Sequence, residues 1–175
     1  MDYNDPLRRD GRAVECTGLE NQQALIGLPG FESLSLRQFS MKKSDLFEAP
    51  PNFLKILGSE GYDYDEENET ISMKFNLTSD FAHTLGTIIQ GGFITAMLDA
   101  SMGHVVTRKY NGDYNSATLS LNVHFLRAGE PGSFEAIGKI NKLGRSIVFT
   151  SSELFQNGKL VATATASNML IPLDE

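Results

Sequence analysis

Hydrophobic and polar residues form one distinctive pattern near the middle of the chain. Residues 91–108 begin with two glycines and are then apolar on nearly every side, which predicts a long buried helix. One carboxylate, Asp99, stands in the middle of this apolar run. Because burying an unpaired carboxylate is costly, Asp99 is expected to find partners or to change its protonation state. We expect the rest of the chain to wrap around this helix.

After the helix, the chain shows the two-residue period of half-buried strands. Residues 117–125 alternate strictly, so two sets of side chains are predicted to face opposite sides of a sheet. One set is Leu119, Leu121, Val123 and Phe125, and the other is Thr118, Ser120, Asn122 and His124. Residues 133–140, 146–155 and 160–171 are predicted as three further strands. An Asn-Gly pair predicts a tight turn between the last two.

The part of the chain before the helix predicts shorter elements. Residues 52–58 form an amphipathic pattern that ends in glycine, which is typical of a short helix. Residues 61–65 and 70–77 flank an acidic turn and are predicted as a β-hairpin. Residues 78–90 are interpreted as a loop that leads into the long helix.

A row of small residues in the last strand indicates how the helix packs. Ala162, Ala164 and Ala166 alternate with hydroxyl residues, so one face of this strand lets a bulky element approach closely. A helix lying across the sheet would suit this face. Helices and antiparallel strands that are segregated along the chain predict an α+β domain, with one sheet covering one helix.

The first part of the chain gives weaker signals. Residues 1–45 are punctuated by glycines and are mostly polar between them, so we interpret them as a poorly defined arm. They form either a weakly ordered arm or an arm that packs on a partner subunit. Residues 46–175 are predicted to form the folded domain.

Composition narrows the class of protein. Hydrophobic residues make up 41% of the 175 residues and charged residues 21%, which fits a globular chain. The net charge of -7 argues against a general nucleic-acid binder. The single cysteine, Cys16, allows no intrachain disulfide and fits a reducing compartment. Without a secretory signal pattern or an apolar run of about 18 residues, we expect a cytoplasmic protein that does not enter a membrane.

Several motifs together resemble a known family. They lie at residues 86–92, at Asp99 and Gly103, and at residues 122–127, 143–146 and 158–162. In order and spacing over about residues 50–171, the sequence is similar to the hotdog-fold acyl-CoA thioesterases. It is nearest to the branch with the phenylacetyl-CoA and hydroxybenzoyl-CoA enzymes. The resemblance implies an antiparallel sheet wrapped around the central helix, subunits paired into a dimer or a dimer of dimers, and hydrolysis of an acyl-CoA thioester.

The resemblance also implies roles for particular residues. Asp99 is the expected general base or nucleophile, and Gln90 stands nine residues earlier, where many members have histidine. The helix-start amides of Gly91 and Gly92 are the expected oxyanion donors. The expected substrate residues are Thr84 or His83 in the preceding loop, Arg127, and Lys142, Gly144, Arg145 and Ser146 around one turn, whose cations would bind CoA phosphates. Thr118 is expected to help hold the attacking water.

The spacing of Gln90 and Asp99 predicts that the active unit is a dimer. Gln90 and Asp99 are nine residues apart on one helix, or about 13 Å along its axis at ~1.5 Å per residue. One thioester carbon cannot lie near both, so the acid and the glycine amides of one site are expected to come from two subunits.

Two other functions remain open at this point. A 3-hydroxyacyl-thioester dehydratase of the same fold would need a histidine beside the acid, and a non-catalytic acyl-CoA-binding protein would not need Asp99. We expect no cofactor and no metal, because CoA is part of the substrate and no zinc-ligand spacing is present.

Overall fold

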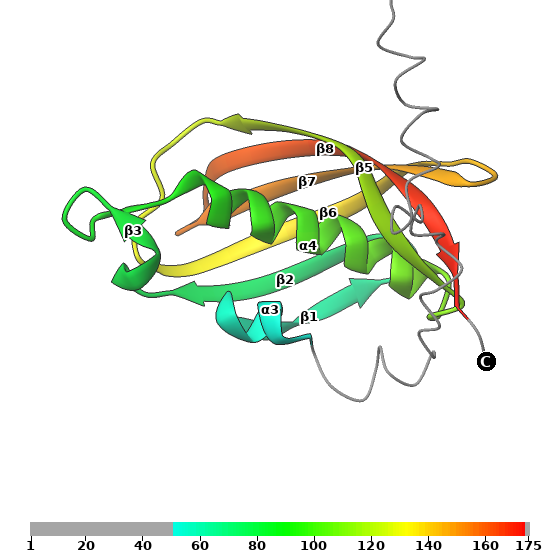
Figure 1. Ribbon diagram of the computed structural model, residues 1–175, viewed down its shortest axis with the longest axis horizontal. Coiled ribbons are helices and arrows are strands. Elements are labelled where there is room, and N and C mark those ends of the chain that lie inside the picture. Colours follow the sequence, from blue (N-terminus) through cyan, green and yellow to red (C-terminus); the bar gives the residue numbers. More distant parts are fainter. Residues whose placement is uncertain (1–50, 174–175) are drawn as a thin grey trace, which may run out of the picture. The chain divides into compact units, whose positions relative to one another are not determined.

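Six strands form one fully antiparallel sheet in the computed structural model, which describes residues 51–173 (Figure 1). The interpretation of residues 1–45 as an arm lies outside the described residues. The sheet order is β1-β2-β6-β7-β8-β5, so β1 and β5 form its two edges. The strands are β1 (Ser59–Asp65), β2 (Thr70–Leu77), β5 (Tyr114–Phe125), β6 (Gly132–Leu143), β7 (Ile147–Gln156) and β8 (Lys159–Pro172).

The long helix α4 (Gly91–Lys109) crosses one face of this sheet, as the sequence predicts (Figure 1). The row of alanines in β8 is buried, with exposed fractions of 0% for Ala162, 2% for Ala164 and 7% for Ala166. The approach to β6 is closer still, because a Cβ on Gly138 would lie 2.6 Å from the carbonyl oxygen of Ser101 on α4. Small residues in two strands therefore allow the helix to lie directly on the sheet.

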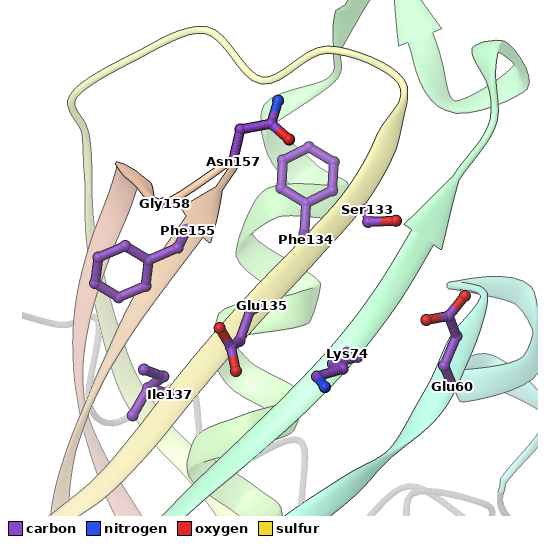
Figure 2. A pocket seen from close by; sticks show the side chains of 9 residues that line it. All are labelled: Glu60, Lys74, Ser133, Phe134, Glu135, Ile137, Phe155, Asn157 and Gly158. Carbon is purple, nitrogen blue, oxygen red and sulfur yellow. The ribbon is translucent and has the colours of Figure 1, made fainter.

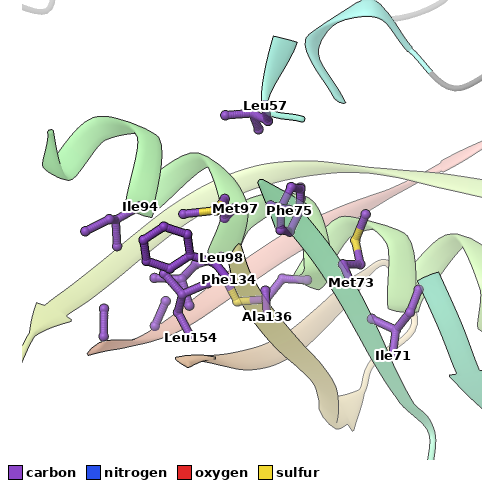
Figure 3. Close-up of a cluster of buried hydrophobic side chains, with 14 of the residues drawn as sticks. Leu57, Ile71, Met73, Phe75, Ile94, Met97, Leu98, Phe134, Ala136 and Leu154 are labelled. Atoms are coloured by element: carbon purple, nitrogen blue, oxygen red, sulfur yellow. The ribbon is translucent and has the colours of Figure 1, made fainter. Parts of the chain in front are cut away.

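The core lies between α4 and the sheet (Figure 3). The alternation in β2 places Ile71, Met73 and Phe75 toward the helix, and all three are fully buried. From α4, Met97 and Leu98 meet them and are also fully buried. Burial of such side chains stabilises the fold by roughly 1.5–3 kcal/mol each. The short helix α3 (Asn52–Ile56) precedes β1, close to the range predicted for it.

The strict alternation predicted for residues 117–125 is wrong at one point. A β-bulge in β5 shifts the register, so that Thr118 pairs with Asn168 while Ser120 pairs with Ser167. Asn168 follows the alanine row at the same two-residue spacing, so Thr118 lies on the helix-facing side rather than with the outward polar set. Leu119 is the extra residue and is 53% exposed. The bulge therefore turns one hydroxyl toward α4.

The segment predicted as a loop also contains short elements. It forms the 3-10 helix η3 (Ser79–Phe81), and β3 (Ala82–His83) pairs with β4 (Ile88–Ile89) in a small hairpin. This hairpin lies beyond the N-terminal end of α4 (Figure 1). The backbone N–H of Gln90 donates to the carbonyl oxygen of Phe81 (3.0 Å), which ties the segment to the helix start.

Candidate active site

The central carboxylate has a hydroxyl partner. The Thr118 hydroxyl donates a hydrogen bond to Asp99 Oδ1 (2.8 Å), across the space between β5 and α4. Asp99 is half-buried and Thr118 is exposed, so water can reach this pair. The expectation that Asp99 would find a partner is confirmed. The bulge described above is what places the Thr118 hydroxyl within reach.

A second layer of polar groups lies behind this pair. Asn168 of β8 is fully buried, and its Oδ1 lies 3.3 Å from Thr118 Oγ1. Asn168 Nδ2 in turn donates to Thr150 Oγ1 on β7 (2.8 Å), and Thr150 is only 1% exposed. A chain of side-chain hydrogen bonds therefore runs from the half-buried acid into the core.

Sequence reasoning missed Asn168 and Thr150. A signal for Asn168 exists, because it continues the series Ala162, Ala164 and Ala166 and is the polar member of that helix-facing row. A polar side chain at such a position requires a buried hydrogen-bond partner. Thr150 has no comparable signal, because a threonine inside a strand is ordinary.

The start of α4 is held by its own capping side chain. Gln90 is the N-cap, and its Oε1 accepts a hydrogen bond from the Gly92 N–H (2.6 Å). The Gly92 amide, which was expected to face the substrate, is therefore engaged within the chain. For the Gly91 N–H, no hydrogen-bond partner is found within residues 51–173. Of the two glycine amides, Gly91 is the one available to a ligand.

A phenyl ring borders this helix start. A Cβ placed on Gly91 would lie 3.2 Å from Cζ of Phe125, the last residue of β5, and Phe125 is 54% exposed. Glycine at position 91 therefore keeps space between the ring and the helix backbone. The N-terminal end of α4 is therefore bordered by apolar surface, which suits the uncharged part of a ligand.

The expected loop residues lie in the small hairpin. His83 Nδ1 is 2.6 Å from Thr84 Oγ1, so these two side chains pair with each other. Thr84 and Leu85 both adopt positive φ values, 53° and 58°, and Leu85 is fully exposed at the tip. Among the described residues, no hydrogen bond joins His83 or Thr84 to Asp99.

The expected phosphate-binding cations lie at two ends of the sheet. Arg127 follows β5 at the end where α4 begins, and its backbone N–H donates to Val161. Lys142 is the penultimate residue of β6, not part of the turn as predicted, and Arg145 lies in the turn that follows. That turn lies toward the other end of α4 and is exposed throughout residues 144–146. The two groups do not form one cluster within a single chain.

Gly144 and Ser146 shape this turn through their backbones. Gly144 donates to the carbonyl oxygen of Ile147 (2.9 Å), and a Cβ on Gly144 would lie 2.5 Å from that oxygen. The Ser146 carbonyl accepts from Leu170 (2.9 Å). Glycine at position 144 is thus explained by close packing of the turn.

The last turns of α4 carry the other charged and aromatic groups. His104 Nδ1 donates a hydrogen bond to the Ala100 carbonyl oxygen (2.7 Å), and the centre of its ring lies 6.3 Å from that of Tyr62. Burial lowers the pKa of His104, and the hydrogen bond to Ala100 opposes this effect. Lys109 forms an ion pair with Glu69. Among residues 51–173, no hydrogen bond joins His104 to Asp99.

A shallow groove of about 440 Å³ lies on the opposite side of the sheet (Figure 2). Lys74, Glu135 and Phe155 line it, and α4 lies behind the sheet in this view. Glu135 accepts a hydrogen bond from Ser72 (2.6 Å). Because the sheet separates this groove from Asp99, the two are different places on the molecule.

Residues 51–173 lack two features of other classes of protein. No helix there is both long and apolar enough to cross a membrane. The same part of the chain contains no group of three or more His, Cys, Asp and Glu side chains that could hold a metal ion.

A comparison with protein families decides the affiliation. Residues 78–169, which include α4, Thr118 and Asn168, match the family described as acyl-CoA thioesterase N-terminal domain. The chain belongs to the acyl-CoA thioesterase family. A relative from Thermoplasma volcanium, named as a candidate esterase, is 29% identical over 79 residues. That match covers 45% of this thioesterase-family chain and 59% of the relative's length.

Solved structures agree with this affiliation. A phenylacetic acid degradation-related protein from Ralstonia eutropha, named as a candidate thioesterase, is 33% identical with a TM-score of 0.67, over 74% of this chain and 99% of that chain. The Escherichia coli PaaI protein, from the phenylacetic acid degradation operon, shares the fold with a TM-score of 0.65 at 16% identity, over 75% of this chain and 94% of that one. The predicted hotdog fold is confirmed.

Proposed function

We propose that this protein hydrolyses an acyl-CoA thioester to the free acid and CoA. The observation that carries the proposal is the half-buried Asp99 carboxylate, held by the Thr118 hydroxyl inside a domain of the thioesterase family. A carboxylate that water can reach, oriented by a hydrogen bond, has the chemistry of a general base. The names of the relatives support a thioester or ester as the bond that is cleaved.

The proposed reaction uses Asp99 to activate a water molecule. Thr118 binds Asp99 Oδ1, which leaves the other carboxylate oxygen to accept a proton from water. The water oxygen attacks the thioester carbonyl carbon, and negative charge develops on the carbonyl oxygen. The C–S bond then breaks, CoA leaves as the thiolate, and the proton on Asp99 passes to the departing sulfur or to water.

The helix start is the proposed oxyanion site. The Gly91 N–H lies at the positive end of the α4 dipole, which favours negative charge. Because Gln90 Oε1 occupies the Gly92 N–H, we propose the Gln90 carboxamide N–H group as the second donor in place of Gly92. Gln90 therefore has two roles in this proposal, as cap and as donor.

The distance along α4 requires two subunits for one site. Gly91 and Asp99 are eight residues apart in one helix, or about 12 Å at ~1.5 Å per residue. We propose that Asp99 of one subunit faces Gly91 of a second copy, which gives two equivalent sites per dimer. Edge strand β5 supports this pairing, because it hydrogen-bonds to β8 alone among the described strands and exposes Leu119 and Phe125 by more than half.

The exposed cations are the proposed binding groups for the phosphates of CoA. Arg127 at one end of the sheet, and Lys142 and Arg145 at the other, lie far apart in a single chain. A dimer would bring different ends of two sheets to one site, so either group can serve the phosphates of CoA. The hairpin of β3 and β4, which carries His83 and Thr84, lies beyond the N-terminal end of α4, where we propose that the bound thioester passes.

The dehydratase alternative receives no support from the geometry. That reaction needs a histidine beside the acid, and His104 instead bonds to the Ala100 carbonyl. A protein that only binds acyl-CoA would keep its affinity for CoA esters without needing the Asp99 carboxylate.

The test is a panel of acyl-CoA esters, with released CoA thiol as the readout. We expect Asp99→Asn to lower kcat by roughly 10²–10⁴-fold, the usual contribution of a general base. Its thermal unfolding and its affinity for an acyl-CoA should change little. Glu153→Gln, which removes an exposed carboxylate from β7, is the matched control and should keep full activity. Full turnover in Asp99→Asn would contradict the proposal, and binding without turnover in the wild type would favour the binding protein.

A further inference from the structure

We propose that the buried amide of Asn168 is a positioning residue for the reaction, acting on Asp99 through Thr118. The inference rests on the proposed function of Asp99 as a general base. It adds that Asn168 Oδ1 receives the Thr118 hydroxyl hydrogen while Asp99 carries the proton taken from water. Asn168 itself touches neither substrate nor the reacting atoms in this account.

The first observation is that Thr118 has one hydroxyl hydrogen and two acceptors. Asp99 Oδ1 lies 2.8 Å from Thr118 Oγ1, and Asn168 Oδ1 lies 3.3 Å from the same atom. A threonine hydroxyl donates only one hydrogen bond at a time in good geometry. The shorter contact to the ionised group is the stronger one, so the hydroxyl points to the carboxylate before the reaction.

The second observation is that the Asn168 amide is fixed in orientation. Its Nδ2 donates to Thr150 Oγ1 (2.8 Å), and both residues are buried, with 0% and 1% exposed. This hydrogen bond directs Oδ1 of the amide toward Thr118. Buried amides are costly unless they are bonded, so the arrangement is held firmly.

The reaction changes which oxygen is the best acceptor for the Thr118 hydroxyl hydrogen. When Asp99 accepts the proton from water on its other oxygen, the carboxyl group loses its negative charge and Oδ1 becomes a weaker acceptor. The Thr118 hydrogen can then turn from Oδ1 to another acceptor. Asn168 Oδ1 lies in place to accept it, so no bond is lost. When the proton leaves Asp99 for the departing sulfur or for water, the hydroxyl turns back.

A second buried polar pair provides a matched control. Ser152 Oγ lies 2.7 Å from Ser101 Oγ, and the Ser101 hydroxyl donates to the Leu98 carbonyl (2.8 Å). Ser152 is 2% exposed and lies in the same sheet as Asn168, yet it makes no hydrogen bond to Thr118 or Asp99 among the described residues. Removing its hydroxyl therefore disturbs a buried hydrogen bond without touching the proposed path.

The experiment is a double-mutant cycle on kcat and KM with one acyl-CoA substrate. Asn168→Leu is made in the wild type and in Thr118→Val, and the thermal midpoint of each variant is recorded. In the wild type we expect kcat to fall about tenfold, the size of one hydrogen bond, with KM nearly unchanged. In the Thr118→Val background, Asn168→Leu should lower kcat less than about twofold, because the hydroxyl through which Asn168 acts on Asp99 is already absent.

The controls separate this role from a structural one. Ser152→Ala should lower the thermal midpoint while leaving kcat unchanged in both backgrounds. Thr150→Val keeps Asn168 but releases its amide, and it should repeat the pattern of Asn168→Leu more weakly. It therefore serves as the test variant if Asn168→Leu does not fold.

Equal losses of kcat in both backgrounds would overturn the proposal, since they would show that Asn168 acts independently of Thr118. A change in KM alone would overturn it as well. If Asp99→Asn is inactive and the cycle is additive, only the role of Asn168 fails. If Asp99→Asn keeps full turnover, the proposed function fails and this inference fails with it.

Discussion

The two halves of the proposed site are built in different ways. The Asp99 half depends on contacts between residues that are far apart in the sequence and that join α4, β5, β8 and β7. The separations are 19 residues for Asp99 and Thr118, 50 for Thr118 and Asn168, and 18 for Thr150 and Asn168. The Gln90 half depends on one contact between residues two positions apart. The first half therefore exists only in the folded domain, whereas the second is a property of the helix start itself.

This difference has consequences for substitutions. A change at Asn168 or Thr150 disturbs buried polar groups that have no replacement partners, which is costly in a low-dielectric core. A change at the helix start meets water, which can satisfy a free amide. We therefore expect the helix start to tolerate substitutions in stability while remaining sensitive in activity.

The largest expected effect at the helix start comes from a proline at its first position. Gly91→Pro removes the N–H proposed as oxyanion donor, yet proline is well accepted at this position of a helix. Gln90 has φ −65° and ψ 135°, which is compatible with a following proline. We expect kcat to fall by roughly 10²–10³-fold with little change in thermal stability. Steady-state kinetics and a melting curve measure both.

Gly91→Ala is the matched control for this prediction. It places a similar Cβ about 3.2 Å from the Phe125 ring but keeps the N–H. The difference in kcat between the two variants separates the effect of the lost amide hydrogen from the effect of crowding against the Phe125 ring. If alanine and proline lower kcat equally, the Gly91 N–H is not the donor.

A smaller effect is expected at the cap. Gln90→Ala removes the side chain that binds the Gly92 N–H and should lower the free energy of unfolding by about 0.5–1 kcal/mol. Gln90→Ser restores a capping oxygen and should recover this stability. It lacks the carboxamide N–H group, so we expect its kcat to stay about tenfold low. Recovery of kcat together with stability would show that Gln90 is only a cap.

The smallest expected effect concerns His104, near the far end of α4. Burial lowers its pKa in the folded state, so the unfolded chain binds the proton more readily. Stability should therefore be fully present above about pH 6.5, the unfolded value, and should fall as the pH drops below it. Because glutamine stays neutral, His104→Gln should lose less free energy of unfolding than the wild type between pH 7.5 and 5.5, as measured by urea unfolding. An unchanged or larger loss would contradict this sign.

Much of the fold could be predicted because it depends on local patterns. The apolar run of α4, the alanine row of β8 and the Asn-Gly turn are visible in the sequence, and each appears in the structure as expected. The family resemblance added the sheet that surrounds the helix. The range predicted for α4 differs from the observed helix by one residue.

The details of the site could not be predicted in the same way. The bulge at Leu119 places Thr118 on the same face as Leu121 and Val123, against the predicted alternation, and an alternating pattern gives no sign of an extra residue. The Asn168–Thr150 contact joins two strands whose register is set only by folding. The engagement of Gly92 by Gln90 is local, but it depends on a side-chain conformation that the sequence does not fix.

Complementation between two inactive variants tests the central claim, that each site combines Asp99 of one subunit with Gly91 of another. Chains carrying Asp99→Asn and chains carrying Gly91→Pro are coexpressed, and the pure mixed dimers and each parent are assayed for CoA release. In a mixed dimer one site carries both changes and the other carries neither. We therefore expect the pure mixed dimers to recover about half of wild-type activity per dimer, and an unfractionated random mixture to recover about a quarter. Activity no higher than that of the parents would show that the acid and the amide of one site belong to the same chain.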